Sequence, residues 1–600
     1  MKLLQLASIC TAAFTSLIAA VALPVEQIEE RDTACTNGAL TRSCWTNGYS
    51  VATDFDQKFP TTGNTVTYNL EITNTTCNPD GHGSRTCLLI NGRFPGPLIR
   101  ATWGDMVVIN VKNSMQDNGT SIHWHGVRQF NSCGDDGVNG LTECPLAPGD
   151  TKTYRFQATQ FGSSWYHSHY SSQYGDGIVG PMIFDGPATS NYDIDLGPYA
   201  LSDWYYPTAF QINSLASQAV QLGGPPPNAD NILINGTNKN ANGGGSYNKV
   251  TMQAGKKYRL RLINMSVDNY IRVSLDNHTM QVMTTDFVPV RPFTVQTLLI
   301  GIGQRYDVVI SANQTAGNYW FRANVATDCL SANNFYGRAI WSYSTVASGT
   351  PSSTAWTEPS TCLEPQAAAP YWVQPVPSGS FNSGSKGLSV AFSKAQVVPG
   401  GDTITVWTLG STSMNIAWEK PTLQYVMDGN SSYPASLDVL PTTSEGSWNY
   451  WVVQQGPNMP PIPHPIHLHG KQLFITYFPY SPQVGGSKLM MLLGHDYFVL
   501  GQGTGTWSSS STLNWATPIR RDTATIPGGG WLAIAFASNN PGAWLMHCHI
   551  AWHVSEGLSV QFLEEPSKIK MPDASEFAKT CSIYNAYYKK SYWKKDDSGL

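Results

Sequence analysis

Short segments in which apolar and polar residues alternate recur along the 600 residues of this chain. Such alternation predicts strands with one buried face, because successive side chains of a strand point to opposite sides. Gly, Pro and Asn separate the segments, and the chain holds 54 Gly and 38 Pro. We therefore predict an all-β fold of short antiparallel strands packed as sandwiches. The predicted strands are 65–73, 105–113, 151–158, 256–264, 305–313, 318–324, 401–409 and 530–538.

The length of the chain suits about three or four domains. Residues 344–386 are rich in Ser, Pro and Ala, which predicts a linker between domains. Only 13% of the residues are charged and the formal net charge is −5, with no block of like charge before the tail. We therefore expect no nucleic-acid partner and no anionic-membrane partner.

The N-terminus has the pattern of a secreted protein. A signal peptide over residues 1–22 is predicted by Lys2, the apolar stretch after it and the small residues around Val21. Residues 23–31 are predicted to form a short pro-segment. No other stretch is long and apolar enough to span a bilayer. We therefore expect an extracellular protein, and seven Asn-x-Ser/Thr sequons fit a glycosylated surface: Asn74, Asn118, Asn235, Asn264, Asn277, Asn313 and Asn430.

The chain has eleven cysteines. Cys10 leaves with the signal peptide, and Cys548 lies in a histidine-rich motif. Nine remain, so at least one is unpaired or bonded in another way, and the sequence does not decide the pairing.

Ten of the thirteen histidines fall into four clusters, which follow the same order twice. "SIHWHG" (121–126) is echoed by "PIHLHG" (465–470), and "SSWYHSH" (163–169) by "GAWLMHCH" (542–549). The repeat indicates two related domains near the ends of the chain and a middle domain without metal ligands. We interpret His82, His278 and His495 as ordinary surface or core residues. The clustered histidines are His123, His125, His167, His169, His464, His467, His469, His547, His549 and His553.

Strand geometry turns these clusters into candidate metal sites. Residues i and i+2 of a strand face the same side, so each His-x-His pair presents two imidazoles together. In the fourth such pair, Cys548 faces away from His547 and His549, so one strand can serve two sites. Two histidines with one cysteine are the ligand set of blue copper, and eight further histidines suffice for a multinuclear cluster. Zinc is the main alternative, but a zinc site usually takes four ligands, fewer than this set contains.

The motifs "HWHG", "HSH", "HPIHLHG" and "HCHIAWHVSEGL" resemble the four copper signatures of the multicopper oxidases, and among them those of ascomycete laccases. The likeness runs from about residue 35 to the C-terminus. It implies three cupredoxin-like Greek-key β-sandwich domains, at 32–187, 188–365 and 366–600. The first and third would hold copper, and the middle one would form a wall of the substrate pocket.

The resemblance also implies which residues bind four copper ions. The type 1 copper would be held by His464, Cys548 and His553. Leu558 stands where some relatives have a methionine ligand, and the loss of a thioether favours Cu(I) and raises the potential. Lys471 stands where relatives often have histidine, but this is not a ligand position. The type 2 copper would use His123 and His467, and the type 3 pair His125, His167, His169, His469, His547 and His549.

By the same resemblance, a substrate gives one electron to the type 1 copper through an exposed edge of His464. The electron passes through Cys548 to His547 or His549, and four such transfers reduce O2 to two waters. Asp136 resembles the acidic residue near the cluster that assists oxygen reduction. Asp268 matches the acidic residue of the phenol pocket, where a carboxylate could accept the phenol proton.

The resemblance further implies three disulfides: Cys35–Cys44, Cys144–Cys581 and Cys329–Cys362. A Cys77–Cys87 bridge would leave Cys133 over. The end of the chain, Asp597 to Leu600, resembles the laccase tail that inserts toward the trinuclear cluster as a plug, with no further trimming needed.

Together these features predict a secreted, monomeric laccase that oxidises phenols and related aromatics with O2. The alternatives are a bilirubin, ascorbate or metal-ion oxidase, or a copper-binding protein without turnover. An enzyme that oxidises Fe(II) would need several carboxylates beside His464, and Asp268 is the one candidate for such a carboxylate. A copper carrier would need the type 1 site alone. Pigment synthesis, lignin degradation and detoxification would all use the same site, so the physiological phenol stays open.

Overall fold

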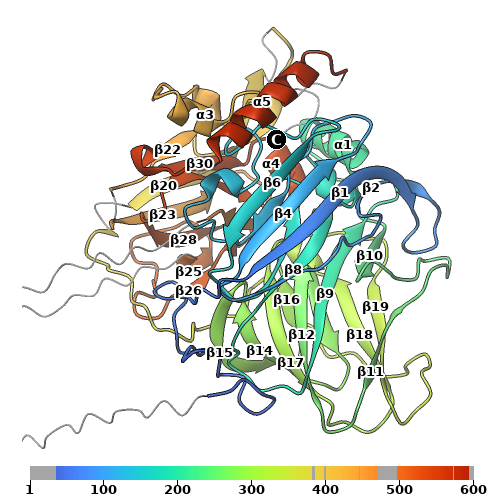
Figure 1. The fold of residues 1–600 in the computed structure, drawn as a ribbon. Helices are drawn as coiled ribbons and strands as arrows, with labels where there is room; N and C mark the ends of the chain where they lie inside the picture. Colours follow the sequence, from blue (N-terminus) through green and yellow to red (C-terminus); the bar gives the residue numbers. More distant parts are fainter. Residues whose placement is uncertain are drawn as a thin grey trace, which may run out of the picture.

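The computed structural model describes residues 35–381, 385–396, 400–444, 446–470, 496–571 and 573–592 (Figure 1). The predicted signal peptide and pro-segment, Lys471, His495 and the tail Asp597 to Leu600 lie outside these residues.

The first sandwich consists of two four-stranded sheets. Its histidines lie on β5 and at the end of β7, two adjacent strands of one sheet. Trp124, between the two histidines of β5, points the other way into an apolar core with Tyr154 and Phe156. One sheet has the order β2 (Arg85–Ile90), β1 (Thr65–Cys77), β4 (Met106–Asn113) and β6 (Thr151–Gln157); the other has β3 (Ile99–Thr102), β8 (Val179–Asp185), β7 (Gly162–His167) and β5 (His123–His125).

The second sandwich has a six-stranded and a five-stranded sheet around its own apolar core. The larger sheet has the order β10 (Asn231–Ile234), β9 (Ile194–Trp204), β12 (Lys257–Asn264), β17 (Arg305–Ser311), β14 (Met280–Thr285) and β15 (Val288–Val295). The smaller sheet has β11 (Asn248–Met252), β19 (Gly337–Tyr343), β18 (Asn318–Val325), β13 (Ile271–Leu275) and β16 (Leu298–Ile300).

The third sandwich repeats this plan and contains β24 and β29, which carry histidines and Cys548. Its six-stranded sheet has the order β21 (Thr403–Leu409), β20 (Ser385–Gln396), β23 (Trp448–Gln455), β28 (Gly530–Ala537), β25 (Tyr497–Thr504) and β26 (Ile519–Arg521). Its five-stranded sheet has β22 (Val439–Pro441), β30 (Ser559–Glu564), β29 (Gly542–Cys548), β24 (His464–Leu468) and β27 (Thr523–Ile526). The described residues also form the helices α1 (Ala209–Leu222), α3 (Thr422–Met427), α4 (Ala551–Ser555) and α5 (Ala574–Tyr588).

The prediction of an all-β sandwich fold is confirmed, and each of the eight predicted segments forms a strand. The expectation of antiparallel pairing alone is wrong: β1–β4, β3–β8, β9–β12, β11–β19, β20–β23 and β22–β30 are parallel. Alternation fixes which face of a strand is buried, but a Greek-key connection decides the direction of its neighbour. The predicted linker holds no strand between Tyr343 and Phe381, and β20 begins at Ser385, within the predicted range. The exact domain boundaries stay a prediction.

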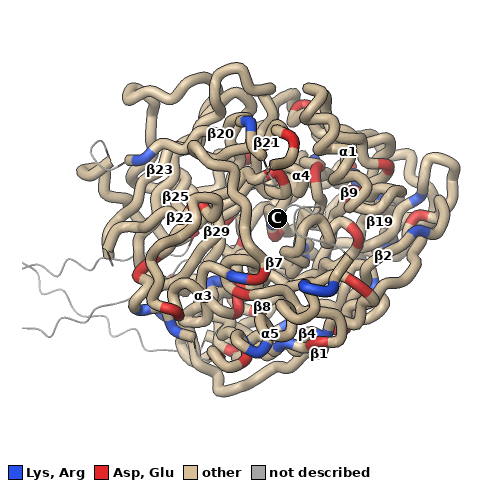
Figure 2. Tube along the Cα trace, turned by 90° about the horizontal axis from the view of Figure 1, so that it is seen from above, with Lys and Arg blue, Asp and Glu red and all other residues tan. Residues whose placement is uncertain are grey.

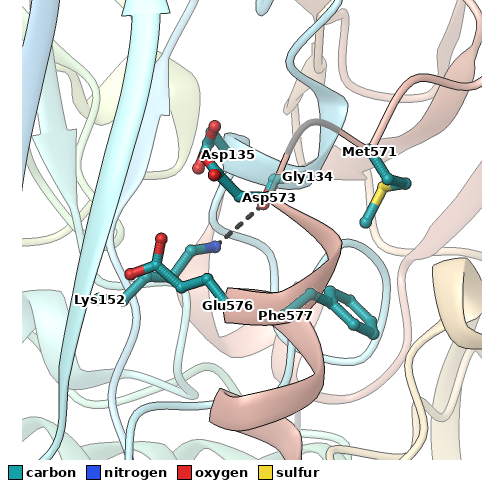
Figure 3. Close-up of a pocket in the computed structure, with 7 residues that line it drawn as sticks. All are labelled: Gly134, Asp135, Lys152, Met571, Asp573, Glu576 and Phe577. Atoms are coloured by element: carbon teal, nitrogen blue, oxygen red, sulfur yellow. Dashed lines mark hydrogen bonds between the residues drawn. The ribbon is translucent and has the colours of Figure 1, made fainter.

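Four disulfides connect the described cysteines, and they include the three pairs implied by the family resemblance. The fourth is Cys77–Cys87, which leaves Cys133 and Cys548 as the free cysteines of the described chain. The Cys144–Cys581 bridge ties α5 to the first sandwich. At the N-terminal end of the same helix, Arg155 forms an ion pair of 3.0 Å with Asp573, which lines the pocket between α5 and Lys152 shown in Figure 3.

Figure 2 shows the charged residues of both signs interspersed along a mostly uncharged trace. Several of these charges are internal: Arg128, Arg261, Arg305, Arg520 and Arg521 are among the largest fully buried side chains. Within the described residues, no helix combines the length and the apolar character needed to cross a membrane. The predicted sequon at Asn264 is not an available acceptor, because this side chain is buried and donates to the carbonyl oxygen of Ile300 at 2.9 Å.

Candidate metal centre

Four His-x-His pairs converge because the first histidine of each lies on a strand that neighbours another such strand. In the first sandwich, His123 is in register with His167 across β5 and β7. In the third, His467 is in register with His547 across β24 and β29, and Cys548 is opposite Ile466. The sequence pattern therefore becomes two groups of imidazoles that lie on buried strands or directly after them.

His464, Cys548 and His553 form a compact triangle on the far side of β29. The Sγ of Cys548 lies 3.6 Å from the Nδ1 of each histidine, and the two Nδ1 atoms are 3.2 Å apart. The helix α4 follows β29 after a short turn and places His553 next to Cys548. A metal bonded to sulfur at about 2.3 Å and to nitrogen at about 2.0 Å needs ligand separations of about 3.5 to 3.7 Å in a trigonal plane. The triangle therefore fits a metal ion.

The thiol of Cys548 needs a cation if it is to ionise. Its burial raises the pKa far above the ordinary range for a cysteine. Leu558 is fully buried in the same apolar cluster, and its carbonyl oxygen accepts the backbone N–H of Cys548 at 3.1 Å. A bound metal would supply the positive charge that this apolar pocket lacks.

The other eight histidines form three groups of three, in each of which the ligand atoms lie within 4.8 Å of one another. Two of the groups, which we call the trios, share no residue and combine histidines from both ends of the chain. One contains His125, His167 and His549, and the other His169, His469 and His547. The third group contains His123, His125 and His467, and it shares His125 with the first trio.

The hydrogen bonds of these rings leave one nitrogen of each free for a metal. The Nδ1 atoms of His123, His467 and His547 donate to backbone oxygens, each at 2.8 Å. His469 Nδ1 donates to the carboxylate of Asp136 at 2.9 Å. Each Nε2 atom is then a bare acceptor, because a neutral imidazole has a single N–H.

Two such acceptors face each other directly. The Nε2 atoms of His469 and His547 are 3.3 Å apart, although each ring has its proton on Nδ1. Further along the site, the buried Nε2 atoms of His123, His167 and His467 have no hydrogen-bond partner among the described residues. Opposed lone pairs in a buried site repel unless a cation lies between them. The eight-histidine site therefore also fits metal ions.

Burial keeps these imidazoles in the neutral form that binds metals. Desolvation lowers the pKa of His464 to about 3 and that of His467 below its ordinary value. In the trios, desolvation and the neighbouring histidines lower the pKa values well below the ordinary value for histidine. A proton therefore does not compete with a metal for these nitrogens near neutral pH.

Asp136 is fully buried between the two strand pairs. Its Oδ2 accepts from His469, its carbonyl oxygen accepts from His123, and its Oδ1 lies 3.4 Å from the Nδ1 of His123. A small cavity of about 20 Å³ lies against other histidines of the site. It is lined by His167, Ser168, His169, Ser171, Tyr174, His547, His549 and Val554.

Asp268 lies on the other side, close to the cysteine. The carbonyl oxygen of its neighbour Val267 accepts from the N–H of Ala551 at 2.9 Å, two residues before His553. Desolvation, helped by the charge of Asp203, raises the pKa of the half-buried Asp268 to about 7. The Asp203 carboxylate also accepts the backbone N–H groups of residues 267, 268 and 269, so it shapes this loop. No sequence motif pointed to Asp203.

The expected exposed edge of His464 is absent from the described structure, where this residue is 0% exposed. The ring of Trp407 packs edge-on against it, with centroids 5.3 Å apart, and also covers His553 at 4.2 Å. The contact comes from β21, which is distant in sequence from the histidine motifs. Of the histidines outside the clusters, His278 is a satisfied core residue bonded to Tyr343, as expected, and the exposed His82 stacks on Tyr206.

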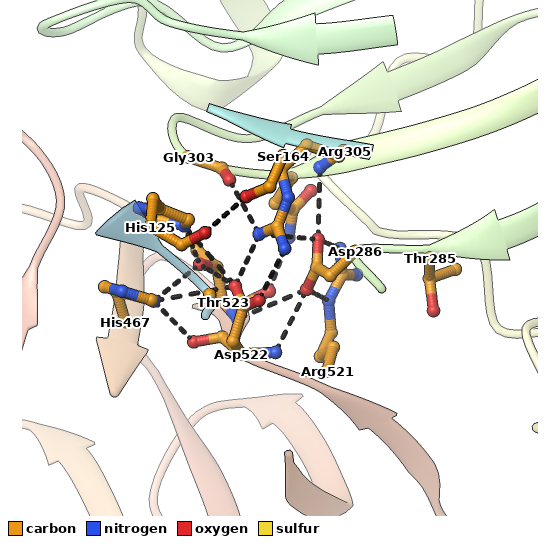
Figure 4. Close-up of polar contacts among 12 residues, drawn as sticks. His125, Ser164, Thr285, Asp286, Gly303, Arg305, His467, Arg521, Asp522 and Thr523 are labelled. Atoms are coloured by element: carbon orange, nitrogen blue, oxygen red, sulfur yellow. Dashed lines mark hydrogen bonds and ion pairs between the residues drawn. The ribbon is translucent and has the colours of Figure 1, made fainter. Parts of the chain in front are cut away.

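A group of charged residues lies beside the eight-histidine site, and no sequence motif predicted it (Figure 4). The carbonyl oxygen of Asp522 is the acceptor for His467, and its carboxylate forms an ion pair with Arg305 of the second sandwich. Single charged residues without a periodic pattern gave no signal of this contact.

Comparison with known proteins agrees with this geometry. Three multicopper oxidase family models match residues 71–189, 196–345, and 410–485 together with 492–568. Laccase-3 of Botryotinia fuckeliana is 50% identical over 78% of this chain and 100% of its own length. The laccase of Neurospora crassa is 41% identical over 94% of this chain and 89% of its own. The crystal structure of the laccase from Botrytis aclada superposes with a TM-score of 0.84 at 41% identity, covering 94% of this chain and 100% of that one.

The matches span all three sandwiches, and the copper signatures predicted from the sequence lie within the matched segments. The chain therefore belongs to the multicopper oxidase family, as an enzyme of the fungal laccase type that uses copper.

Proposed function

We propose that this enzyme oxidises phenols and related aromatics one electron at a time beside His464, Cys548 and His553, and reduces O2 to water among the eight histidines. The observation that carries the proposal is the position of β29. Its Cys548 belongs to the triangle, while His547 and His549 on either side of it belong to the two trios. Covalent bonds thus join a one-metal site to a three-metal site.

The ligand sets would accommodate four copper ions. His464, Cys548 and His553 would hold the type 1 ion, and His123 with His467 the type 2 ion. The trios His125, His167, His549 and His169, His469, His547 would hold the type 3 pair. Bound copper would supply one-electron redox chemistry in the triangle and oxygen reduction in the larger site.

The chain's own residues would handle the protons. Asp268, which lies beside the triangle, would accept the hydroxyl proton of a phenol as the electron leaves. Asp136 would keep His469 in the tautomer whose Nε2 is free, and its Oδ1 would hold a proton near the site of oxygen reduction. Burial of both sites would exclude bulk water from the reacting groups.

The test combines copper counting with oxygen uptake on a panel of phenols. We expect about four copper ions per chain and oxygen uptake with phenols. Copper binding with activity on Fe(II) alone would support a metal-ion oxidase instead, and copper without turnover would support a binding protein. Secretion, a monomeric state and glycosylation also belong to this proposal, and the mass and N-terminal sequence of the protein from culture medium would test them.

A further inference from the structure

The second sandwich has no histidine in the metal site, yet it contacts the site through Arg305, the first residue of β17. The guanidinium forms a bidentate pair with Asp522 of the third sandwich: Nη1 lies 2.6 Å from Oδ1 and Nη2 lies 2.7 Å from Oδ2. Both side chains are buried. Nη1 also donates to the carbonyl oxygen of Gly303, and Nε to that of Ser163 in the first sandwich. One side chain thus joins all three sandwiches.

Asp522 in turn contacts two histidines of the site. Its carbonyl oxygen accepts from His467 Nδ1 at 2.8 Å, and its Oδ1 lies 3.4 Å from His125 Nε2. The hydroxyl of Thr523 donates to the same Oδ1 at 2.9 Å and lies 3.1 Å from His467 Nδ1. These contacts fix the tautomers that leave His467 Nε2 and His125 Nδ1 for a metal. Figure 4 shows these side chains converging from different strands.

A second carboxylate fixes the backbone on which Asp522 stands. Asp286, from the turn between β14 and β15 of the second sandwich, accepts the N–H groups of Asp522 and Thr523 at 3.1 and 3.3 Å. Its other oxygen accepts the N–H of Arg305 at 3.1 Å. The position of the Asp522 carbonyl, and hence of the His467 ring, therefore depends on two residues of the second sandwich.

This arrangement explains the glycine of the first His-x-His-Gly motif. Gly126 has a φ of +72°, and a Cβ there would lie 2.4 Å from Oδ2 of Asp522 and 2.5 Å from Nη2 of Arg305. Any side chain would displace the ion pair. The two histidines of this motif are candidate metal ligands, and its glycine leaves room for the Arg305–Asp522 ion pair.

We propose that Arg305 is a positioning residue for the eight-histidine site, which it controls by holding Asp522 against His467 and His125. The inference rests on the proposed function of that site. It gives the second sandwich a role in oxygen reduction, in addition to any part in the substrate pocket. Removal of the guanidinium would leave the Asp522 carboxylate buried without its partner, and the carboxylate would turn toward the histidines or toward water.

The test compares copper-loaded Arg305→Lys and Arg305→Met with the unmodified enzyme. The electron paramagnetic resonance signal of type 2 copper should change its hyperfine splitting or lose intensity in Arg305→Met, with a smaller change in Arg305→Lys. Turnover with O2 should fall by about 10- to 100-fold, as is usual when a partner of a metal ligand is removed. The blue absorption of the Cys548 site and its anaerobic reduction by a phenol should stay at the unmodified level.

Arg259→Met is the matched control. Arg259 is also buried in the second sandwich and pairs with Asp307, two residues beyond Arg305, but it has no contact with the histidines. This variant should lose thermal stability and keep the type 2 signal. If Arg305→Met behaves in the same way, with a lower melting temperature and an unchanged type 2 signal, Arg305 is merely structural and the proposal is wrong.

If Arg305→Met does not fold, Arg305→Lys provides the decision, because it keeps a positive charge at this position and removes the bidentate pair with Asp522. A changed type 2 signal would support the proposal, and an unmodified signal would overturn it. The proposed function fails by a different result: the unmodified enzyme would then lack either the blue absorption or the oxidation of phenols.

Discussion

The two proposed metal-binding regions of this molecule are built in opposite ways. The triangle of His464, Cys548 and His553 belongs to one sandwich and lies among apolar side chains such as Leu558 and Trp407. The eight-histidine site is shared by the first and third sandwiches, and its rings are held by backbone oxygens and carboxylates. An apolar pocket suits a site that exchanges electrons alone, whereas a site that also needs protons requires polar groups around it.

The largest effect should come from Cys548→Ser, which removes the residue common to both regions. We expect the blue absorption and phenol-driven oxygen uptake to disappear, because an alcohol is not a thiolate ligand. The type 2 signal of the eight-histidine site should persist. Optical spectra, oxygen uptake and electron paramagnetic resonance of the same sample measure all three, and retention of phenol oxidation would contradict the role of the cysteine.

Asp268→Asn should affect the phenol side alone, by about 100-fold in kcat/KM, the lower range for loss of a general base. Burial raises the pKa of Asp268 to about 7, so its carboxylate is protonated below this pH and ionised above it. Only the ionised form accepts a proton, so anaerobic reduction of the blue site by a phenol should speed up as pH rises toward 7. The asparagine variant should lack this rise; a pH profile equal to that of the unmodified enzyme would remove Asp268 from the mechanism.

Asp136→Asn should affect the oxygen side alone, by about 10- to 100-fold in turnover, because it weakens the anchor of His469 and removes a proton acceptor. Stopped-flow reoxidation of the fully reduced enzyme by O2 isolates this step. Reduction by phenol should keep its unmodified rate, and a slower reduction with normal reoxidation would assign Asp136 to the wrong region.

The smallest effect should come from Leu558→Met, which offers a thioether to the apolar triangle. A redox titration followed at the blue band should show a lower potential, because a thioether favours Cu(II) relative to leucine. The free energy of unfolding should change by less than about 1.5 kcal/mol, since the two side chains have similar volumes. A potential that does not fall would show that residue 558 does not reach the metal.

Sequence alone predicted the strands and the grouping of the histidines, because both depend on local spacing. Alternation located β1 and β28, and the i, i+2 rule correctly placed Cys548 on the side of β29 opposite to His547. The family resemblance supplied the disulfide pairing, including Cys144 with Cys581, which are 437 residues apart.

What sequence analysis missed depends on contacts between distant segments. Arg305 and Asp522 are 217 residues apart, and neither belongs to a repeated motif. The burial of His464 under Trp407 likewise requires the position of β21. A lone charged or aromatic residue gives no periodic signal, so its partner becomes visible only when the sheets are assembled.

The most direct test of this account is an anomalous difference map, recorded at the copper absorption edge from crystals of the copper-loaded enzyme. We predict one peak within bonding distance of Cys548 Sγ and three peaks among the eight histidines. A single peak, or peaks away from these histidines, would contradict the arrangement of two copper sites joined through β29.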